Sequence, residues 1–516
     1  MGSFTLLDAV VLGAYLVGVT AFGMWLGRRQ KDARDYFLAG EGLPWWAICF
    51  SVVATETSAL TFISVPATAY GSDFWMLQLT IGYLVGRVAI AAVLLPGYFR
   101  GRLSTAYAVL EERFGEGTRR FASSIFMMTR ALGDSVRIFA AAIPLTLITG
   151  LDYWQSILAM GGFTLLYTYY GGLRAVVWVD VVQMGLYILG GVAALAVLLH
   201  AVPGGWGEIL ATADAAGKLR IFHLDGGFAD GTWFVTGLVG GAFLSMASHG
   251  VDHLIVQRLL ASKSLGDARK ALIGSGVAVI GQFALFLLVG IGLFAYYGGR
   301  VFSTPDEVFP RFILEGLPPG LSGLIIAAVL AAAMSTVSSS LNSLASATTH
   351  DLYAPIAGRE GDEEHLFRVG RRFTLLWALI LIGGAILFQF ASQGTPVVVI
   401  ALQIASFTYG GLLGGFLLGN LSRRADQRDA VTGMATAIAL MAALWAAQQF
   451  GAMEKRVDTL WFALLGSVVT VAVGTASAAL RGRAPVAVPT PASAGPATEA
   501  RDDAAAGALG AGSDPS

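Results

Sequence analysis

Residues 54–61, ATETSALT, place one carboxylate and four hydroxyls in the middle of a long apolar segment. The segment runs over residues 43–70, and roughly 20 apolar residues are enough to cross the hydrocarbon core of a membrane. A central acidic residue there costs about 2.5–3.5 kcal/mol, so Glu56 is expected to face a cavity or a cationic partner. Pro66 interrupts the helical hydrogen bonding of the same run. Polar residues in a broken span are typical of transporter binding sites, which indicates a membrane transport protein.

The composition also excludes an ordinary soluble domain. The 516 residues are 55% hydrophobic and 13% charged, whereas soluble domains carry about 25% charged residues. We therefore predict an all-α membrane protein with about thirteen spans of hydrophobic, membrane-crossing length. These spans lie near 5–27, 43–70, 76–99, 120–149, 153–171, 174–200, 232–251, 271–298, 321–348, 371–392, 395–419, 428–450 and 458–480.

The loops between these spans indicate an orientation in the lipid bilayer of the plasma (inner) membrane. Every second loop is rich in Arg and Lys, and Arg258 is counted among these loop cations. The intervening loops are poor in cations. The positive-inside rule then places the N-terminus outside and the C-terminus in the cytoplasm.

The domain organisation follows from the same pattern. Residues 1–483 are expected to form a single transmembrane domain, with a first repeat over about 43–200 and a second over about 232–419. Residues 484–516 consist mostly of Ala, Pro, Gly and Ser, which predicts a disordered cytoplasmic tail. A short helix is expected near 305–314, and residues 252–270 are interpreted as a short helix at the membrane surface.

A second polar cluster lies in the ninth span, where residues 334–343 read MSTVSSSLNS. Serine and threonine in membrane helices often bond back to their own helix, which is the ordinary interpretation of Ser338, Ser339 and Ser343. Ser335 and Thr336 gain interest beside the broken second span, because hydroxyls and freed carbonyls suit hard alkali cations. An inverted repeat of five spans would pair the second span with the seventh, which is also rich in small residues.

Several of these segments together resemble the sodium/solute symporter family, over roughly residues 5–480. The segments are DYFLAG at 35–40, YGGLRAVVWVDVVQ at 170–183, VQR at 256–258, MSTVSSSLNS at 334–343 and DLY at 351–353. The family includes sodium-coupled carriers of sugars, proline, sialic acid, iodide and monocarboxylates.

The resemblance implies a LeuT-type fold, that is, a five-plus-five inverted repeat with one extra N-terminal helix and two extra C-terminal helices. It also implies Na⁺ as the coupling ion, in a site between the second and ninth spans. The backbone carbonyls of Ala54, Thr57 and Ala332 would bind the ion together with the hydroxyls of Ser335 and Thr336.

The resemblance further separates classes of solute. Glu56 stands where the family's proline carriers have Asp and its sugar carriers have Asn. Thr61 replaces the His of certain sugar carriers, which argues against a hexose. Gln403 falls where sugar carriers place a substrate-binding Gln, so a sugar symporter of the same family stays open as an alternative.

Other polar residues in the spans have two interpretations each. Arg137 can clamp a substrate carboxylate, or it can pair structurally with Asp134 or with Glu56. Asp180 is either an ion-path carboxylate or a structural residue. Two further candidates for the solute site are Gln78, at the start of the third span, and His249, at the break of the seventh. In addition, Arg87 is expected to be structural, paired internally or extended toward the interface.

The predicted function is therefore secondary active uptake of a small polar solute driven by sodium, with a carboxylate or zwitterion favoured over a hexose. A solute sensor without net transport is the alternative from another class. A channel fits less well, because a closed midplane site favours alternating access. The sequence shows neither a nucleotide loop nor a nucleophile elbow, so an enzyme is not expected. Nucleic acid and an obligate protein partner are not expected either.

Overall fold

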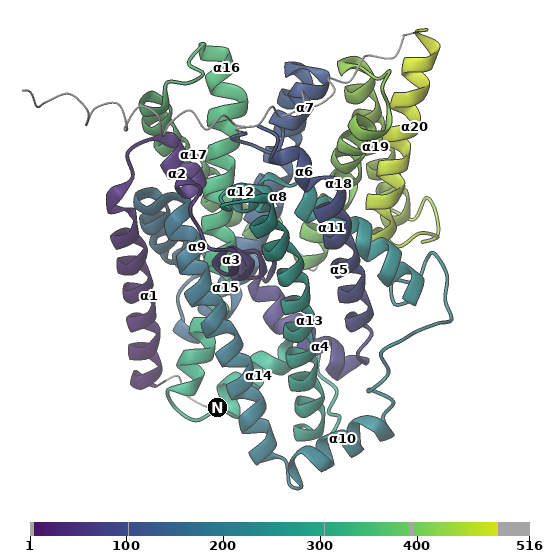
Figure 1. Ribbon diagram of the computed structural model, residues 1–516. Helices are drawn as coiled ribbons and strands as arrows, with labels where there is room; N and C mark the ends of the chain where they lie inside the picture. Colours follow the sequence, from purple (N-terminus) through teal and green to yellow (C-terminus); the bar gives the residue numbers. More distant parts are fainter. Residues whose placement is uncertain (1–4, 102, 304, 392–396, 483–516) are drawn as a thin grey trace, which may run out of the picture.

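The computed structural model describes residues 5–101, 103–303, 305–391 and 397–482 (Figure 1). Over these residues the chain is helical and forms no strand, apart from one bridge between Leu43 and Ser262. Eight helices in this part of the chain are long and apolar enough to cross a membrane, or nine if a bent pair counts as one span. The predicted tail, 484–516, lies outside the described residues.

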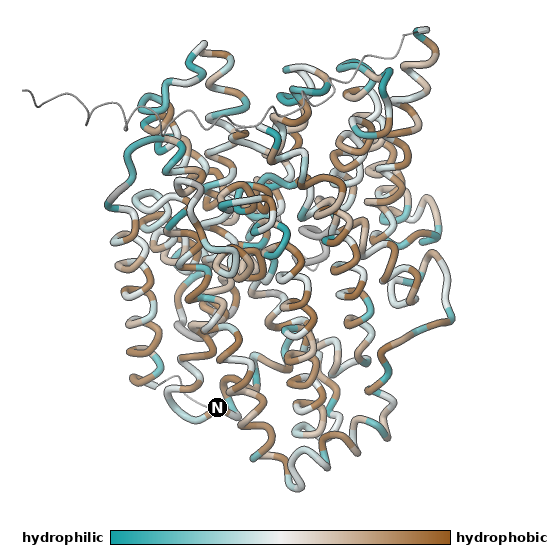
Figure 2. The backbone as a smooth tube through the Cα atoms, viewed as in Figure 1, coloured by the Kyte–Doolittle hydropathy of each residue, from teal (hydrophilic) through white to brown (hydrophobic). Residues whose placement is uncertain are grey.

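The long helices carry most of the mass of the molecule. Their bounds are α1 (Leu6–Leu26), α5 (Met76–Val93), α8 (Glu116–Thr149), α9 (Tyr153–Ala201), α13 (Leu265–Tyr296), α15 (Leu321–Ala347), α17 (Glu363–Ala391), α18 (Val397–Leu421), α19 (Gln427–Gln449) and α20 (Phe462–Leu480). Figure 2 shows apolar residues along these helices and hydrophilic residues gathered at their ends and inside the bundle.

Shorter elements break or connect the long helices. The α-helical ones are α2 (Ala33–Leu38), α3 (Trp45–Glu56), α4 (Ala59–Gly71), α6 (Leu95–Tyr98), α7 (Ala108–Phe114), α10 (Gly205–Ala215), α11 (Gly241–Gly250), α12 (His253–Leu260), α14 (Val308–Glu315) and α16 (Ala354–Ala357). The remaining turns are η1 (Gly27–Arg29), η2 (Ala39–Glu41), η3 (Thr236–Gly240), η4 (Pro305–Glu307), η5 (Thr348–Tyr353) and η6 (Thr459–Trp461). The short helix predicted near 305–314 is confirmed by η4 and α14.

The polar second span is broken, and the break lies within the hydroxyl-rich stretch rather than at Pro66. Helix α3 ends at Glu56, Thr57 is extended, and α4 starts after Ser58, with a bend of 65° between the two helices. Ser58 and Thr61 form a capping box, in which each side chain accepts a hydrogen bond from the other's backbone N–H. Side-chain caps thus provide the hydrogen bonds that let a new helix begin, and α4 continues through Pro66 to Gly71.

A second break separates α11 from α12. Helix α11 ends at Gly250, and the side chain of Asp252 caps α12 by accepting a hydrogen bond from the backbone N–H of Leu254. All eight residues of α12 are buried, including Arg258, which is fully buried. The interpretation of 252–270 as a surface helix is therefore wrong for α12, and Arg258 is not a loop cation. The sequence suggests a surface helix because apolar residues alternate with charged ones there, whereas every residue of α12 is buried in the protein.

Helix α9 covers two of the predicted spans in one element, and it is kinked at Gly172. Gly172 has a φ of 51° and a ψ of −159°, a conformation that favours glycine. A Cβ atom there would lie 2.5 Å from the carbonyl oxygen of Tyr36. The paired glycines of the YGG motif therefore allow α9 to turn while α2 packs directly against the kink.

Helix α15 occupies the centre of the bundle, and its whole length from Ile325 to Ala347 is buried. It packs against α9, α8, α1 and α17. The N-terminal end of α1 and the C-terminal end of α20 lie at opposite ends of the bundle (Figure 1). The polar cluster of the ninth span is therefore held in the interior, facing the broken helices α3 and α4.

Candidate functional site

A central cavity of about 500 Å³ lies between the two interrupted segments, α3 with α4 and α11 with α12. Residues of α3, α4, α5, α8, α11, α12, α13, α15 and α18 line it, and it reaches the connection at Gly231 and the turn at 458–460. Among the residues that the sequence proposes for the solute, the cavity brings together Glu56, Thr61, Arg137 and His249. Two residues of the proposed cation set, Thr57 and Thr336, line the same cavity.

Glu56, at the end of α3, is paired with Arg87 of α5. Arg87 is fully buried and also donates a hydrogen bond of 2.6 Å to the hydroxyl of Ser275. His249 Nε2 lies 3.0 Å from Arg87 Nη2 and 3.4 Å from a carboxylate oxygen of Glu56. The internal pairing expected of Arg87 is confirmed. The alternative in which Glu56 pairs with Arg137 is not found, because Arg137 pairs with Asp134.

The charge of Glu56 is thus balanced within the protein, although its side chain remains 20% exposed toward the cavity. The other nitrogen of His249, Nδ1, lies 2.8 Å from the hydroxyl of Ser248. Both ring nitrogens of His249 therefore already have protein partners. Thr61 is likewise engaged in the capping box with Ser58, so its hydroxyl serves the start of α4 while it lines the cavity.

Arg137, on α8, pairs with Asp134 one turn earlier at 2.8 Å, through Nη1 alone. Asp134 is buried, also accepts a hydrogen bond from Ser340, and lies 3.6 Å from Arg130. The guanidinium of Arg137 makes no further hydrogen bond to the described residues, and its side chain is 24% exposed. Arg137 therefore presents spare donors to the cavity while Asp134 fixes its position.

A second ion pair at the cavity wall was not found from the sequence. Arg130 of α8 is bound by Asp252, and Tyr409 of α18 donates a hydrogen bond of 2.8 Å to the same carboxylate. Arg130 and Tyr409 line the cavity, while Asp252 is the residue that caps α12. These three residues tie α8, α12 and α18 together beside the cavity. From the sequence, an Asp before a helix indicates only an ordinary N-cap, so nothing near Asp252 predicted that it also binds Arg130.

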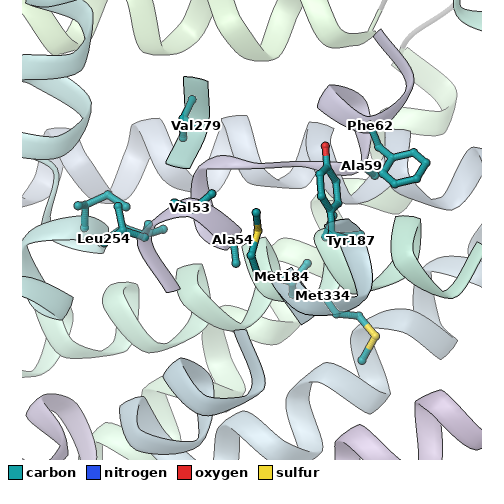
Figure 3. Packing of buried hydrophobic residues seen from close by; sticks show 14 of the residues in the cluster. Val53, Ala54, Ala59, Phe62, Met184, Tyr187, Leu254, Val279 and Met334 are labelled. Atoms are coloured by element: carbon teal, nitrogen blue, oxygen red, sulfur yellow. The ribbon is translucent and has the colours of Figure 1, made fainter. Parts of the chain in front are cut away.

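A second, small void, too narrow for a water molecule, adjoins the break of α3 and α4, and Thr57 lines both it and the central cavity. Four of the five residues of the proposed cation site line it: Ala54, Thr57, Ala332 and Ser335. Met184 and Tyr187 of α9 complete part of its wall, and Figure 3 shows both beside Ala54 at the end of α3. Ser58 N–H, the usual helical partner of the Ala54 carbonyl, faces the hydroxyl of Thr61 instead at 3.4 Å. The break thereby frees a carbonyl oxygen at the void.

Asp180 is connected to this void through Ser335. The Ser335 hydroxyl donates a hydrogen bond of 2.6 Å to Asp180, which also accepts one of 2.5 Å from Ser51. Arg258 lies 3.3 Å from the same carboxylate, and both charged residues are fully buried. Because Ser335 gives its proton to Asp180, the lone pairs of its oxygen are left for another partner. Asp180 thus orients Ser335 and, with Arg258, joins α9 to α12.

Three predicted residues lie apart from their expected neighbours. Thr336 faces the large cavity, and its hydroxyl donates a hydrogen bond of 3.2 Å to the carbonyl of Ala332. Gln78 is fully buried and bonded to Thr232, so it does not line the cavity. Gln403, on α18, is half-buried and also outside the cavity wall, to which the same helix contributes Tyr409.

Comparison with known proteins agrees with this architecture. The model of the sodium:solute symporter family matches residues 36–437. The chain is 30% identical over 485 residues to the sodium/sialic acid symporter NanT of Aliivibrio fischeri, covering 92% of this chain and 93% of that protein. It is 30% identical over 456 residues to sodium-coupled monocarboxylate transporter 1 of Xenopus laevis, covering 86% of this chain and 72% of that protein.

Solved structures show the same fold. A Na⁺-coupled sialic acid symporter in a substrate-bound, outward-open state superposes with a TM-score of 0.83 and 28% sequence identity. The alignment covers 94% of this chain and 99% of that one. The nucleobase-cation symporter Mhp1 is more distant, with a TM-score of 0.53 and 14% identity, and shares the fold alone. The family and these relatives are transporters and not enzymes.

Proposed function

The chain belongs to the sodium:solute symporter family, and from this premise we propose that its sodium-coupled solute is a small carboxylate or zwitterion bound at Arg137. Sodium is the coupling ion of the family, and a small-molecule solute is its cargo. The proposal concerns which class of solute this chain carries and which of its residues hold it.

The single observation that carries the proposal is the state of Arg137. Its guanidinium lines the central cavity, is held by Asp134 through one nitrogen, and keeps its remaining donors free of the described residues. A planar guanidinium with two parallel donors matches a carboxylate in both geometry and charge. The other arginine at the cavity wall, Arg130, is already bound by Asp252, and Arg87 behind Glu56 is bound by that carboxylate.

The sugar alternative receives less support from the same cavity. Gln403, whose position suggested a sugar carrier, lies outside the cavity wall. Two of the relatives are named as carriers of sialic acid and of monocarboxylates, and both classes of solute carry a carboxylate. A sensor without net transport remains the alternative from another class, and measured uptake separates it from a symporter.

For the coupling ion, we propose the void beside α3 and α4. The carbonyls of Ala54, Thr57 and Ala332 and the hydroxyl of Ser335 supply neutral oxygens, the ligand type that hard alkali cations prefer. Thr336 adjoins the set through its bond to the Ala332 carbonyl. Glu56 and His249 are proposed to shape the neighbouring solute site, with Thr61 at its edge, whereas Gln78 and Gln403 are left out of it.

We also propose that the chain crosses the membrane thirteen times and contains the five-plus-five inverted repeat expected from the sequence. Thirteen crossings require that α9 spans twice about its kink, and that α8, η3 with α11, and α18 each span once. The breaks that follow α3 and α11 fall in the first helix of each proposed half, as an inverted repeat requires. An odd number of crossings fits the opposite positions of the start of α1 and the end of α20 (Figure 1), and we place the start of α1 on the outside.

The test is binding of carboxylate solutes to Arg137→Gln in sodium. We expect binding to weaken by about 2–4 kcal/mol, the range for truncating one partner of a buried charge contact. Arg120→Gln is the matched control, because Arg120 is on the same helix but pairs with Glu116 far from the cavity wall. Unchanged carboxylate binding by Arg137→Gln would end the proposal.

A further inference from the structure

A surface pocket of about 490 Å³ lies at the C-terminal end of α1. Its walls come from α1, the turn η1, α2 with η2, and α9 just beyond the kink at Gly172. Two arginines, Arg28 and Arg174, and one carboxylate, Asp35, line it. No described residue lines both this surface pocket and either of the two cavities described above, so the proposed solute and sodium sites do not account for it.

The surface pocket lies at the level where the hydrocarbon core of a membrane ends. The 21 residues of α1 rise about 31 Å at about 1.5 Å per residue, close to the roughly 30 Å of that core. Helix α1 stands at the edge of the bundle (Figure 1), and only 22% of its most apolar stretch is buried. Trp25, in its last turn, is 60% exposed, and tryptophan is enriched at the level of the lipid headgroups. Lipid therefore borders the pocket.

The turn that follows α1 is tied to the kink of α9. The side-chain amide of Gln30 donates a hydrogen bond to the carbonyl oxygen of Gly171, directly before the kink at Gly172. Arg28 precedes Gln30 by two residues, and Arg174 follows Gly172 by two residues. The tether therefore brings two arginines from separate parts of the chain into the wall of one pocket.

The charged groups of the surface pocket do not pair with one another. Arg28 and Arg174 are exposed, and among the described residues neither guanidinium has a hydrogen-bond or ion-pair partner. The carboxylate of Asp35 accepts one long hydrogen bond, of 3.4 Å, from the backbone N–H of Lys31 and forms no ion pair in the described part of the chain. Both signs of charge thus stay available in one pocket, which suits a ligand that itself carries both.

We propose that the surface pocket binds the headgroup of phosphatidylethanolamine, a phospholipid with one phosphate and one primary ammonium group. Guanidinium groups bind phosphate oxygens through parallel N–H donors, so Arg28 and Arg174 hold the phosphate. Basic pockets between membrane helices bind lipid headgroups in this way. The ammonium group then pairs with Asp35, and the acyl chains follow the exposed apolar face of α1 past Trp25.

The carboxylate selects this headgroup over those of other common phospholipids. The ammonium of ethanolamine has N–H donors for Asp35, whereas choline carries methyl groups in their place. Phosphatidylglycerol has no cation to pair with Asp35, and the charge of this residue opposes an anionic lipid. Two arginines alone would instead favour the most negative lipid. Binding in the surface pocket is independent of the proposed function, because neither the solute nor sodium takes part.

The experiment measures thermal unfolding of the purified protein in detergent, in potassium and without solute. Phosphatidylethanolamine, phosphatidylcholine and phosphatidylglycerol with the same acyl chains are each titrated, and the rise in stability gives an apparent Kd. We expect the lowest Kd for phosphatidylethanolamine. Arg28→Gln and Arg174→Gln should each raise that Kd about fivefold, which is about 1 kcal/mol. Asp35→Asn should remove the preference for phosphatidylethanolamine over phosphatidylcholine.

Two controls accompany the titrations. Arg423→Gln is the matched variant, because Arg423 is an exposed arginine between α18 and α19 that has no described partner and does not line the surface pocket. It should leave the affinity for all three lipids unchanged. Glycerophosphoethanolamine, which is the headgroup without acyl chains, and inorganic phosphate should cause no shift at the concentration at which the lipid saturates.

Four results would overturn the proposal. Equal affinity for the three lipids, unchanged in the variants, would show only a general coating of the apolar surface. A preference for phosphatidylethanolamine that survives Asp35→Asn would remove the ammonium group from the pocket. A shift by either soluble phosphate compound as large as that by the lipid would identify a soluble ligand instead. A loss in Arg423→Gln equal to that in Arg28→Gln and Arg174→Gln would show attraction to the overall charge rather than binding in the pocket.

Discussion

Each buried charge near the two cavities has an opposite charge beside it. Glu56 is matched by Arg87, Asp180 by Arg258, and Asp252 by Arg130. An isolated charge in a low-dielectric interior is costly. Removing one partner of a buried pair is therefore strongly destabilising, because it leaves the other charge unmatched. Among these groups, Arg137 differs because it is held through a single nitrogen and faces the cavity. The charge balance at the residue scale therefore points to the solute site.

The pair of Glu56 and Arg87 can be tested by a double-mutant cycle in thermal unfolding. Breaking a buried pair costs about 3–5 kcal/mol, and we expect less here because Glu56 is partly exposed to the cavity. Glu56→Gln combined with Arg87→Gln should recover part of the loss, with a coupling of about 0.5–3 kcal/mol.

The control cycle pairs Glu56→Gln with Arg137→Gln. These two substitutions should be additive, because Arg137 pairs with Asp134. A larger coupling of Glu56 with Arg137 than with Arg87 would contradict the charge pairing described here.

The sequence could predict that Glu56 needs a partner, but it could not choose between Arg87 and Arg137. The cost of a buried carboxylate follows from its hydrophobic surroundings alone, whereas its partner depends on how α5 and α8 pack against α3. The same reason explains why the sequence did not predict two other ion pairs, Asp252 with Arg130 and Arg258 with Asp180. Asp252 and Arg258 both lie in a segment that reads as a cytoplasmic loop, and only the burial of α12 brings their partners within reach.

At the scale of elements, the two helix breaks shape the walls of the central cavity and of the small void. The hydroxyl-rich stretch ends α3 and caps α4, which frees the carbonyl of Ala54 at the void. Asp252 caps α12 after the break that follows α11. The sequence indicated both interrupted segments, although Pro66, which it marked as an interruption of the helical hydrogen bonding, lies inside α4. A proline removes one hydrogen bond and can be carried inside a helix, whereas Ser58 and Thr61 supply the caps that start a new one.

The kink of α9 provides a test at this scale. Gly172→Ala would place a Cβ atom 2.5 Å from the Tyr36 carbonyl oxygen, at a residue with positive φ. Strained backbone conformations of this kind cost about 1–3 kcal/mol, so we expect a clear drop in unfolding temperature. The matched control is Gly162→Ala on the same helix, where a Cβ would meet no atom within 4 Å. That variant should unfold at or slightly above the wild-type temperature, and an equal loss in both variants would contradict the kink assignment.

Arg481, at the C-terminal end of α20, pairs with Asp426 and Asp429 at the N-terminal end of α19. The hydrogen bond from Arg481 holds the pKa of Asp426, just outside the membrane-spanning part of α19, below its ordinary value. A depressed pKa means that this contribution to stability is complete above the ordinary Asp pKa of about 3.9 and is lost as the pH falls through the lower folded value.

Arg481→Gln should therefore lower the unfolding temperature by a constant small amount between neutral pH and about pH 5. The difference from the wild type should shrink as the pH falls below about 4, because Asp426 then binds a proton in the unfolded chain before it does so in the folded protein. Unfolding temperatures measured across this range check the prediction. A difference that grows on acidification has the wrong sign and would contradict it.

For the whole molecule, the fold and the transport class could be predicted from the sequence, while the solute could not. Long apolar spans, two polar interruptions and several family segments determine the class of protein. The solute depends on which donors remain free after the internal pairs have formed, and that balance appears only once the helices are packed. The same holds for Gln403 and Gln78, whose positions along the chain suggested solute contacts and which do not line the central cavity.

The energetics of sodium coupling set the scale of uptake. A tenfold sodium gradient provides about 1.4 kcal/mol, and a membrane potential of about 100 mV adds about 2.3 kcal/mol per charge. One sodium ion can thus support a roughly 500-fold accumulation of a neutral solute, since each 1.4 kcal/mol corresponds to about a factor of ten. A zwitterion behaves as a neutral solute in this respect.

The central claim is that sodium and a carboxylate-bearing solute bind together in this chain, with Arg137 holding the carboxylate. The most direct measurement is a thermal-shift screen of the purified protein against monocarboxylates, amino acids, sialic acid and hexoses, each in sodium and in potassium. We predict that a carboxylate solute raises the unfolding temperature in sodium, that potassium removes most of this rise, and that Arg137→Gln abolishes it. Stabilisation by a hexose alone, or by a carboxylate equally in sodium and potassium, would contradict the account.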